Sequence, residues 1–321
     1  MSRIATILCA ASLAACMHAA NVTYSDGKVS FHETTPEGGT FDVEFASCMA
    51  NRLFTFSRVS LDSVAVNVTG SDNIGPFLIG GAGWTGGNHL NGDRRSADTE
   101  SVAVSADGRV LQDGCATECR RLRVEVKNRL FHPVTDSLFC IERMVYYVQG
   151  NSIQVEACHE FVCEKPETVE RYYGMQSMMI GETETLTPGG AYAQWTPQQD
   201  VDRFTKASAP LFDTFVEHSQ HGYQACHMDT CGLGSRAMVD DDDVVFIGNS
   251  WTKSYHKLIG TKKVAKGDVT RWKGVYTWFR NPDTDTCRGG SPGEFAYRGY
   301  YDGRPVLFRF RPGRATEKIC K

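Results

Sequence analysis

Short runs in which apolar and polar residues alternate recur along the whole chain. Residues 101–105 and 122–126 alternate strictly, and residues 59–68 combine alternation with β-branched side chains. Alternation places successive side chains on opposite faces of an extended strand, so that one face can be buried. Residues 143–148 and 153–157 continue the pattern. We therefore expect each of these segments to form a strand.

Turn signals separate these runs. An Asp-Gly pair stands between two extended segments at Asp26-Gly27, Asp107-Gly108 and Asp302-Gly303. This pair tolerates the left-handed backbone conformation that two-residue hairpin turns need. Helix signals are few: Thr196 and Pro197 suit the start of a short helix through Asp202, and residues 213–221 suit one more helical turn.

Frequent turns between short alternating strands indicate an antiparallel sandwich. We predict an all-β fold, namely a large antiparallel β-sandwich of the jelly-roll or supersandwich kind. The chain has 321 residues, so residues 21–321 are interpreted as one domain, with a division near 185–197 as the alternative. The net charge of -4 and the lack of a basic stripe argue against nucleic acid as a partner.

Residues 1–20 have the pattern of a secretory signal peptide. Arg3 supplies the positive charge, and residues 4–15 form an apolar stretch that is too short to span a bilayer. No later stretch has the length and apolarity of a membrane span, so we expect a secreted, extracellular protein. Residues 13–16 also resemble a bacterial lipobox, which leaves a lipid anchor at Cys16 as the alternative.

The cysteines indicate an oxidising compartment. Ten of them follow the export segment, and an even count in an exported chain is typical of disulfide bonds. These are Cys48, Cys115, Cys119, Cys140, Cys158, Cys163, Cys226, Cys231, Cys287 and Cys320. Each bond adds about 2–4 kcal/mol of stability. We therefore predict a disulfide-braced sandwich, with a connectivity that the spacing does not determine.

A glycine-rich segment runs from Gly80 to Asp93. It carries Trp84, Asn88, His89 and Asn91, and Arg94 follows it. Glycine permits positive φ and lets a ligand approach the backbone closely. An aromatic ring, amides, an imidazole and a guanidinium that suits carboxylates predict a site for a polar ligand such as a sugar. The alternative is an ordinary surface turn.

Two further segments carry residues of the same kind. In a regular strand over 170–176, Arg171, Tyr173 and Met175 share one face, whereas Tyr172 and Gln176 share the other, unless Gly174 marks a bulge. In a strand over 249–257, one face combines a ring, a phenol and a cation at Trp251, Lys253 and Tyr255. We predict that Tyr173, Gln176 and this second face contact the ligand. Packing within a sheet and a solvated strand face are the alternatives.

We predict no metal and no cofactor. The segments Cys158–Cys163 and Cys226–Cys231 both follow a Cys-His-x-x-x-Cys pattern, which is not the spacing of the usual zinc modules. The acidic run Asp240–Asp243 lacks the spaced ligands of a calcium loop, so we interpret it as a solvated turn. The motifs of serine hydrolases, P-loop enzymes and zincin proteases are absent from the sequence.

The candidate residues fit β-elimination on a uronic-acid polymer. A cation or amide must neutralise the carboxylate, a base must remove the neighbouring proton, and an acid must protonate the leaving oxygen. Asn88, Arg94 or Gln176 are candidates for the first role, His89 for the second and Tyr173 for the third.

The β-rich export profile, with the Asn88-His89 pair and the segment from Tyr172 to Gln176, resembles β-sandwich polysaccharide lyases and related extracellular carbohydrate-active proteins. The resemblance lies in residue types across most of the chain. It implies an acidic polysaccharide or other glycan as the partner. Two alternatives stay open: a non-catalytic glycan-binding or adhesive protein, and a mutarotase-like sandwich with Glu156, Glu160 or Asp93 as base.

Overall fold

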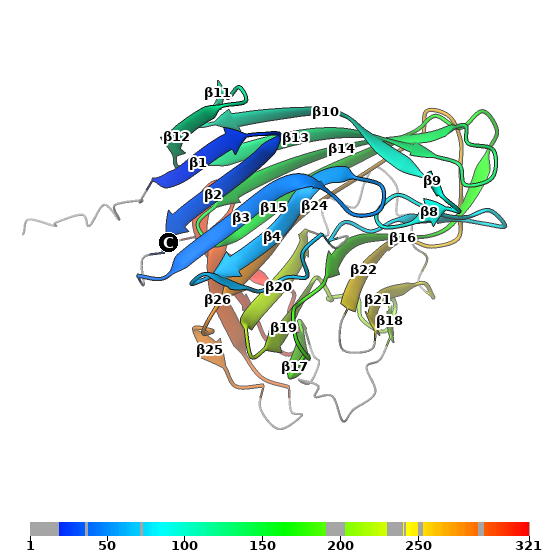
Figure 1. Cartoon of the computed structure of the whole chain (residues 1–321). Helices are drawn as coiled ribbons and strands as arrows, with labels where there is room; N and C mark the ends of the chain where they lie inside the picture. Colours follow the sequence, from blue (N-terminus) through cyan, green and yellow to red (C-terminus); the bar gives the residue numbers. More distant parts are fainter. Residues whose placement is uncertain are drawn as a thin grey trace, which may run out of the picture.

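The computed structural model describes residues 19–35, 38–70, 73–190, 203–229, 240, 242–249, 253–287 and 292–320. Every helix or strand assigned within these ranges is a β-strand, and neighbouring strands pair antiparallel, so the predicted all-β fold is confirmed there (Figure 1). No helix in the described ranges has the length and apolarity needed to cross a membrane. Residues 1–18, the candidate helix from Thr196 to Asp202 and Trp251 lie outside them.

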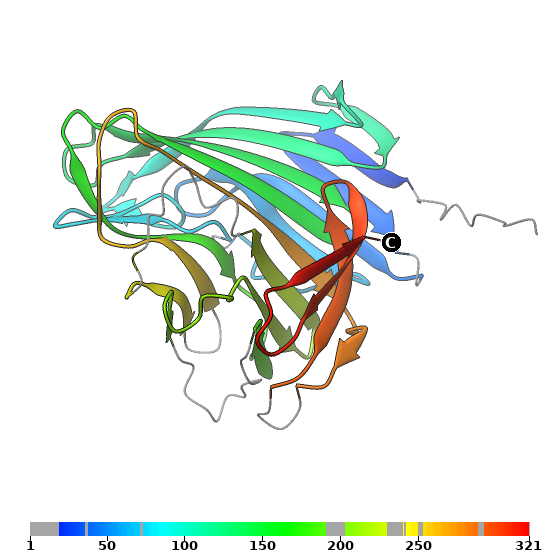
Figure 2. The same ribbon diagram turned by 180° about the vertical axis from the view of Figure 1, so that it is seen from behind.

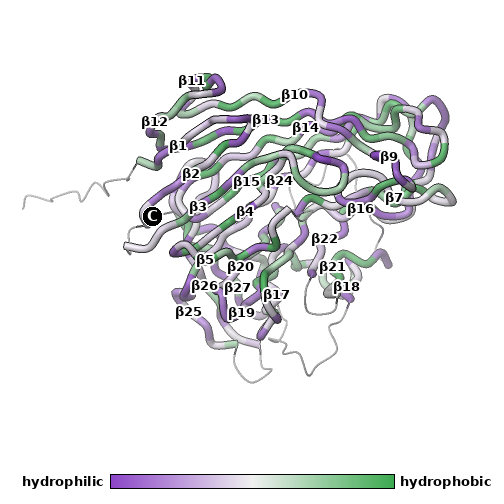
Figure 3. Tube along the Cα trace, viewed as in Figure 1, coloured by the Kyte–Doolittle hydropathy of each residue, from purple (hydrophilic) through white to green (hydrophobic). Residues whose placement is uncertain are grey.

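A nine-stranded sheet forms the centre of the fold, in the order β11-β10-β13-β14-β15-β24-β20-β19-β17. Its strands are β10 (Ala97–Ala106), β11 (Arg109–Val110), β13 (Leu122–Phe131), β14 (Leu138–Gln149), β15 (Ser152–Phe161), β17 (Thr185–Pro188), β19 (Thr214–Ser219), β20 (Gly222–Asp229) and β24 (Val269–Phe279). Hydrophobic and hydrophilic positions alternate along the long strands, as the sequence pattern predicts (Figure 3). One face of the sheet is therefore largely apolar.

A six-stranded sheet covers part of this apolar face (Figure 1). It has the order β12-β1-β2-β3-β4-β5, with β1 (Ala20–Ser25), β2 (Lys28–Thr34), β3 (Thr40–Cys48), β4 (Leu53–Leu61), β5 (Val64–Ala65) and β12 (Cys115–Cys119). Aromatic rings fill the interface: Phe45 and Phe56 lie 5.4 and 5.9 Å from Tyr146, between ring centroids. Such edge-to-face pairs stabilise a core beyond the area they bury.

A seven-stranded sheet covers the rest of the same face. Its order is β18-β21-β22-β16-β6-β7, with β23 paired to β16. The strands are β6 (Phe77–Ile79), β7 (Gly83–Thr85), β16 (Glu167–Ser177), β18 (Arg203–Thr205), β21 (Val244–Asn249), β22 (Lys253–Ile259) and β23 (Lys262–Val264). Phe77 packs on Phe161, and Phe246 packs on Phe215. The outer face of this sheet carries the groove described below.

A four-stranded sheet lies behind the central sheet, on its opposite face (Figure 2). It consists of β25 (Thr284–Asp285), β26 (Phe295–Tyr301), β27 (Arg304–Phe310) and β28 (Glu317–Cys320). A small second core forms there, in which the rings of Phe279 and Tyr297 stack at 5.0 Å. The fold therefore has three layers at this end.

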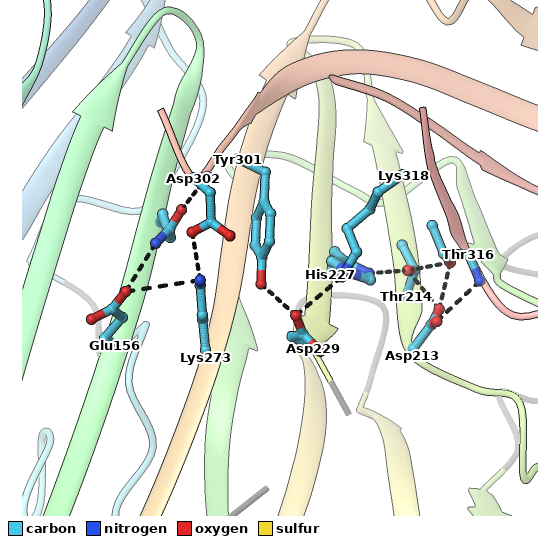
Figure 4. A network of polar contacts seen from close by, with 11 residues as sticks. Glu156, Asp213, Thr214, His227, Asp229, Lys273, Tyr301, Asp302, Thr316 and Lys318 are labelled. Carbon is cyan, nitrogen blue, oxygen red and sulfur yellow. Dashed lines mark hydrogen bonds and ion pairs between the residues drawn. The ribbon is translucent and has the colours of Figure 1, made fainter. Parts of the chain in front are cut away.

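A polar network borders this second core (Figure 4). The Tyr301 hydroxyl donates to Asp229 at 2.6 Å, and the Lys318 ammonium lies 3.0 Å from the same carboxylate. The Thr316 amide donates to Asp213, whose pKa is raised by burial. Burial also lowers the pKa of His227 to about 3, so this histidine is neutral at physiological pH. The network ties the four-stranded sheet to β19 and β20.

Local turn chemistry is confirmed at all three Asp-Gly pairs. They join β1 to β2, β10 to β11 and β26 to β27, and each aspartate and glycine has positive φ. Two other predictions of local structure, over 59–68 and 213–221, are wrong. The strand expected over 59–68 ends at Leu61, where Asp62 and Ser63 adopt positive φ and turn the chain into β5. Residues 214–219 form β19 rather than a helical turn, because they pair with strands on both sides.

The described part of the chain contains no disulfide bond. Nine of the ten cysteines expected to form disulfide bonds fall within it, and none of the nine is joined to another by such a bond. Cys231 lies outside the described residues. Disulfide bracing is therefore not shown and stays a prediction.

Candidate functional site

A groove of about 360 Å³ lies on the seven-stranded sheet. Six of the ten residues predicted for the site line it: Trp84, His89, Tyr173, Gln176, Lys253 and Tyr255. Pro76, Arg171, Arg203 and Ile247 complete the lining. Residues separated by more than 170 positions in the sequence therefore meet in one cavity, because β7, β16 and β22 belong to one sheet. The volume is in the range of small-molecule sites.

Four rings form a continuous row along the groove. The Trp84 ring lies 5.1 Å from His89 and 5.7 Å from Tyr173, with nearly parallel planes in both pairs. Tyr173 in turn lies 4.6 Å from Tyr255. These contacts fix the orientation of each ring, which preorganises the imidazole and the phenols. Because the rings pack on one another, we expect their polar atoms to matter more for a ligand than their faces.

An arginine accompanies the central phenol. The Arg171 Nη1 group donates to the hydroxyl oxygen of Tyr173 at 3.2 Å. A phenol oxygen that accepts this bond can still donate its own proton to a ligand. Arg171 also lines the groove, so its guanidinium is available to an anionic group at the same place. The pair therefore combines a proton donor with a cation.

Strand β16 positions three lining residues through an irregular register. Its pairing with β22 shifts between Tyr172 and Tyr173, and again between Tyr173 and Gln176. Tyr173 and Gln176 both reach the groove as a result, although strict alternation predicts opposite faces for them. The neighbouring Tyr172 is buried, and its hydroxyl accepts the Trp272 indole N–H at 2.9 Å. The expected alternation over 170–176 is therefore wrong.

Gly75 allows the chain before β6 to pass close to β16. A Cβ atom at this position would lie 1.6 Å from the carbonyl oxygen of Tyr173. Any other residue would push apart the two segments that hold Pro76 and Tyr173 at the groove. This glycine is required for steric reasons.

A buried amide braces the glycine-rich segment. Asn51, which is fully buried, donates to the carbonyls of Gly87 and His89 at 2.8 and 2.9 Å. Its side-chain oxygen accepts the Ser96 amide at 2.8 Å, and the Ser96 hydroxyl accepts the Gly86 amide at 3.0 Å. Trp84 and His89 therefore stand on a fixed backbone. This segment also contains short strands: β7, and the ribbon of β8 (Leu90–Asn91) and β9 (Arg94–Arg95).

Three of the remaining predicted site residues, Asn88, Asn91 and Arg94, do not line the groove. The Asn88 side-chain oxygen accepts the backbone amide of Ala50 at 2.9 Å, which makes it part of the loop brace. Arg94 pairs with Asp136 at 3.0 Å. Asn91 lies in β8, and Trp251 falls outside the described residues. The expected strand over 249–257 is instead a hairpin, since β21 ends at Asn249 and β22 begins at Lys253.

A buried carboxylate lies behind the groove. The hydroxyls of Ser177 and Ser254 both donate to Glu217 of β19, the second at 2.5 Å. Ser177 and Ser254 are cross-strand partners, each next in sequence to a lining residue. Burial raises the pKa of Glu217, and the two hydroxyl bonds oppose the rise. Glu217 therefore ties the two strands of the groove floor to the central sheet.

The groove is cationic. Arg171, Arg203 and Lys253 contribute three positive charges, and the described lining residues include no carboxylate. The pair of carboxylates that most glycoside hydrolases use is therefore missing from the described lining. The carboxylates considered for a mutarotase, Glu156, Glu160 and Asp93, are not part of it either.

No group of three or more metal-ligating side chains occurs among the described residues. His159, the histidine of the first Cys-His pattern, contacts Glu142 at 2.9 Å. In the acidic run, Asp240 pairs with Lys262 at 2.6 Å, and Asp243 lies 3.6 Å from Lys257. Nearby lysines therefore contact two of the three described carboxylates of this run.

No family model matches the chain, and no curated protein sequence matches it. Solved structures with a similar arrangement include a glycoside hydrolase family 97 enzyme from Pseudoalteromonas sp. strain K8 (TM-score 0.47, 11% identity, 76% of this chain and 35% of that one). Another is the GH36 alpha-galactosidase AgaB from Geobacillus stearothermophilus (0.49, 9%, 81% and 41%). A third is a mutant of heparan sulfate lyase HepC from Pedobacter heparinus (0.38, 7%, 94% and 42%).

All three of these proteins have names of enzymes that act on carbohydrates. The chain spans 35–42% of their lengths. At these identities and TM-scores, the likeness assigns no activity to this chain. The function has to be argued from the groove itself.

Proposed function

We propose that the groove binds an acidic glycan and cleaves it by β-elimination at a uronic-acid unit. The observation that carries this proposal is the composition of one cavity. It unites three cations with His89, Tyr173 and Gln176, and its described lining includes no carboxylate. Cations attract the carboxylate of the sugar, whereas an acidic side chain would repel it.

Each step has a candidate group in the groove. Arg171 or Gln176 neutralises the sugar carboxylate, which makes the proton on the adjacent carbon acidic. His89 takes this proton as the base. The electron pair forms a carbon–carbon double bond, the bond to the glycosidic oxygen breaks, and Tyr173 gives its proton to that oxygen. The products are a new reducing end and an unsaturated sugar.

This assignment changes the neutralising group. Asn88 and Arg94 were candidates from the sequence, but the first braces the loop and the second pairs with Asp136. Arg171 takes their place because it lines the groove and contacts Tyr173. In a uronic-acid unit, the carboxylate lies close to the bond that breaks. The cation that neutralises the carboxylate should therefore lie close to the acid that protonates the leaving oxygen, as Arg171 does to Tyr173.

The test is an absorbance assay for unsaturated product on a panel of uronic-acid polymers. We expect product from at least one polymer, and loss of that product in the His89→Gln and Tyr173→Phe variants. Binding of a polymer without product in the wild type would instead support the non-catalytic glycan-binding function. Failure to bind or cleave any acidic polymer would contradict both.

We also propose that the chain is exported, on the basis of residues 1–20 and the cysteine content. The intact mass of the protein from its native host tests whether residues 1–20 are removed and whether the cysteines are oxidised. We expect a mature N-terminus near Asn21, or lipid on Cys16, and a thiol count below ten after denaturation. A full-length cytosolic product with twelve reactive thiols would contradict export.

A further inference from the structure

The groove runs across the strands of its sheet rather than along them. Its lining comes from β18, β21, β22, β16 and β7, and Pro76 directly precedes β6. The lining thus follows the whole path β18-β21-β22-β16-β6-β7, from one edge of the sheet to the other, and leaves out only β23, which lies off this path. Since neighbouring strands lie about 4.8 Å apart, a ligand that follows the lining extends over roughly 20 Å. That length exceeds a single sugar ring.

One row of residues defines the outer part of the groove. Arg203 pairs with Ile247, Ile247 with Tyr255, and Tyr255 with Gln176. Paired residues in an antiparallel sheet point to the same face, so the row is continuous over four strands. Arg203 ends this row on the edge strand β18 and is exposed. About 14 Å separates its backbone from that of Gln176.

The cations therefore lie at separate places. Arg171 is five residues from Gln176 along β16, and its guanidinium is held at the Tyr173 hydroxyl. The backbones of Arg171 and Arg203 therefore lie about 20 Å apart, because they are separated by five residues along the strands and by three strand spacings across them. Lys253, two residues before Tyr255, lies on the other side of the row from Arg171, because β22 runs antiparallel to β16. One carboxylate cannot satisfy cations that are so far apart.

We infer that the β18–β21–β22 end of the groove is a second anion subsite, formed by Arg203 and Lys253. It binds a further anionic group on the same ligand, so that the ligand is a linear glycan with negative charges on successive units, lying across the strands. This inference rests on the proposed function for the first anion, at Arg171 and Tyr173. Only the second subsite requires an oligomer.

The experiment measures binding by calorimetry with uronic-acid oligosaccharides of two, four and six units. Arg203→Gln is expected to weaken binding of the longer oligomers by about tenfold, and to leave the disaccharide nearly unchanged. Arg171→Gln is expected to weaken binding of every length. Arg271→Gln is the matched control, because Arg271 is exposed on β24 and does not line the groove.

The outcomes separate the two proposals. Equal effects of Arg203→Gln on all lengths, or no effect on any, would overturn the second subsite while the first stands. Length-dependent binding without product would overturn the lyase activity and retain the subsite. A wild-type protein that binds none of the oligomers would overturn both.

Discussion

Tyr173 is the residue on which the proposed chemistry depends most. Its ring packs between Trp84 and Tyr255 in the aromatic row, and its hydroxyl oxygen accepts a bond from Arg171. The hydroxyl can therefore be removed without disturbing the ring contacts. Removal of the hydroxyl therefore tests the role of its proton separately from the role of the ring.

Tyr173→Phe should lower kcat by at least about 100-fold, because the leaving oxygen loses its acid. The Kd for an acidic oligosaccharide should change little, since the ring and the cations remain. Steady-state rates and calorimetry on the same preparation measure the two effects. A normal kcat in this variant would remove Tyr173 from the proposed mechanism.

Asn51 is a residue that neither composition nor motif singles out. Asn51→Ala should lower the free energy of unfolding by about 2–3 kcal/mol, because it leaves buried carbonyls and amides of the loop without partners. It should also weaken ligand binding, since Trp84 and His89 lose their fixed backbone.

Asn88→Ala is the matched control for this effect, because it removes a single exposed bond to Ala50. We expect a loss of about 1 kcal/mol or less for it. Urea denaturation gives both values, and hydrogen exchange over residues 83–95 reports the loop directly. Equal losses in the two variants would contradict the bracing role of Asn51.

At the scale of elements, Glu217 connects the groove to the central sheet. Glu217→Ala should weaken ligand binding by about tenfold and lower the free energy of unfolding by about 3 kcal/mol, because two buried hydroxyls lose their acceptor. Glu217→Gln keeps an acceptor oxygen and should bind nearly as the wild type does. Calorimetry on the two variants measures the difference. Equal binding by both would show that the bonds from Ser177 and Ser254 to Glu217 do not position Gln176 and Tyr255.

Regular local patterns were sufficient to predict many of these elements. The Asp-Gly pairs identify three hairpins because their turn geometry depends on two residues only. Prediction is wrong where pairing with distant segments determines the secondary structure. An example is β19, which forms between two strands of the central sheet. The register shifts in β16 are equally invisible to an alternation rule, although Gly174 is a local hint of irregularity.

The sequence predicts which residues line the groove better than it predicts how they are arranged. Residue type and glycine content suffice to nominate Trp84, His89, Tyr173 and Tyr255, which meet in the structure. Arg203 is missed, because an arginine in a short polar run looks like any solvated charge, and Arg171 is placed on the face of Tyr173 without a role of its own. Asn88 and Arg94 are nominated for their chemistry, but contacts with Ala50 and Asp136 occupy them.

At the scale of the whole molecule, Glu33 connects two layers. This β2 residue is nearly buried, and its carboxylate accepts the amide of Gly150, at the turn between β14 and β15, at 2.8 Å. Burial raises its pKa to about 7, and the Gly150 bond opposes the rise. The folded state therefore prefers the protonated form, whereas the unfolded chain ionises near its ordinary value.

Glu33 should consequently make stability depend on pH. Its contribution is fully present below pH 4.5 and is lost as the pH rises through about 7, a change of about 3 kcal/mol. The stability of Glu33→Gln relative to the wild type should therefore increase by about this amount from pH 4 to pH 8. Urea denaturation across that range measures it, with Glu118→Gln, at an exposed position of β12, as the control. A difference that does not vary with pH would contradict the role of Glu33.

The central claim is that the groove acts on the carboxylate of an acidic glycan. Its most direct test compares one uronic-acid polymer that the wild type binds with the same polymer after its carboxyl groups are reduced to alcohols. We predict unsaturated product from the native polymer and none from the reduced one, because reduction removes both the charge that the cations bind and the acidity of the adjacent proton. Equal product from the two polymers, or none from either, would contradict it.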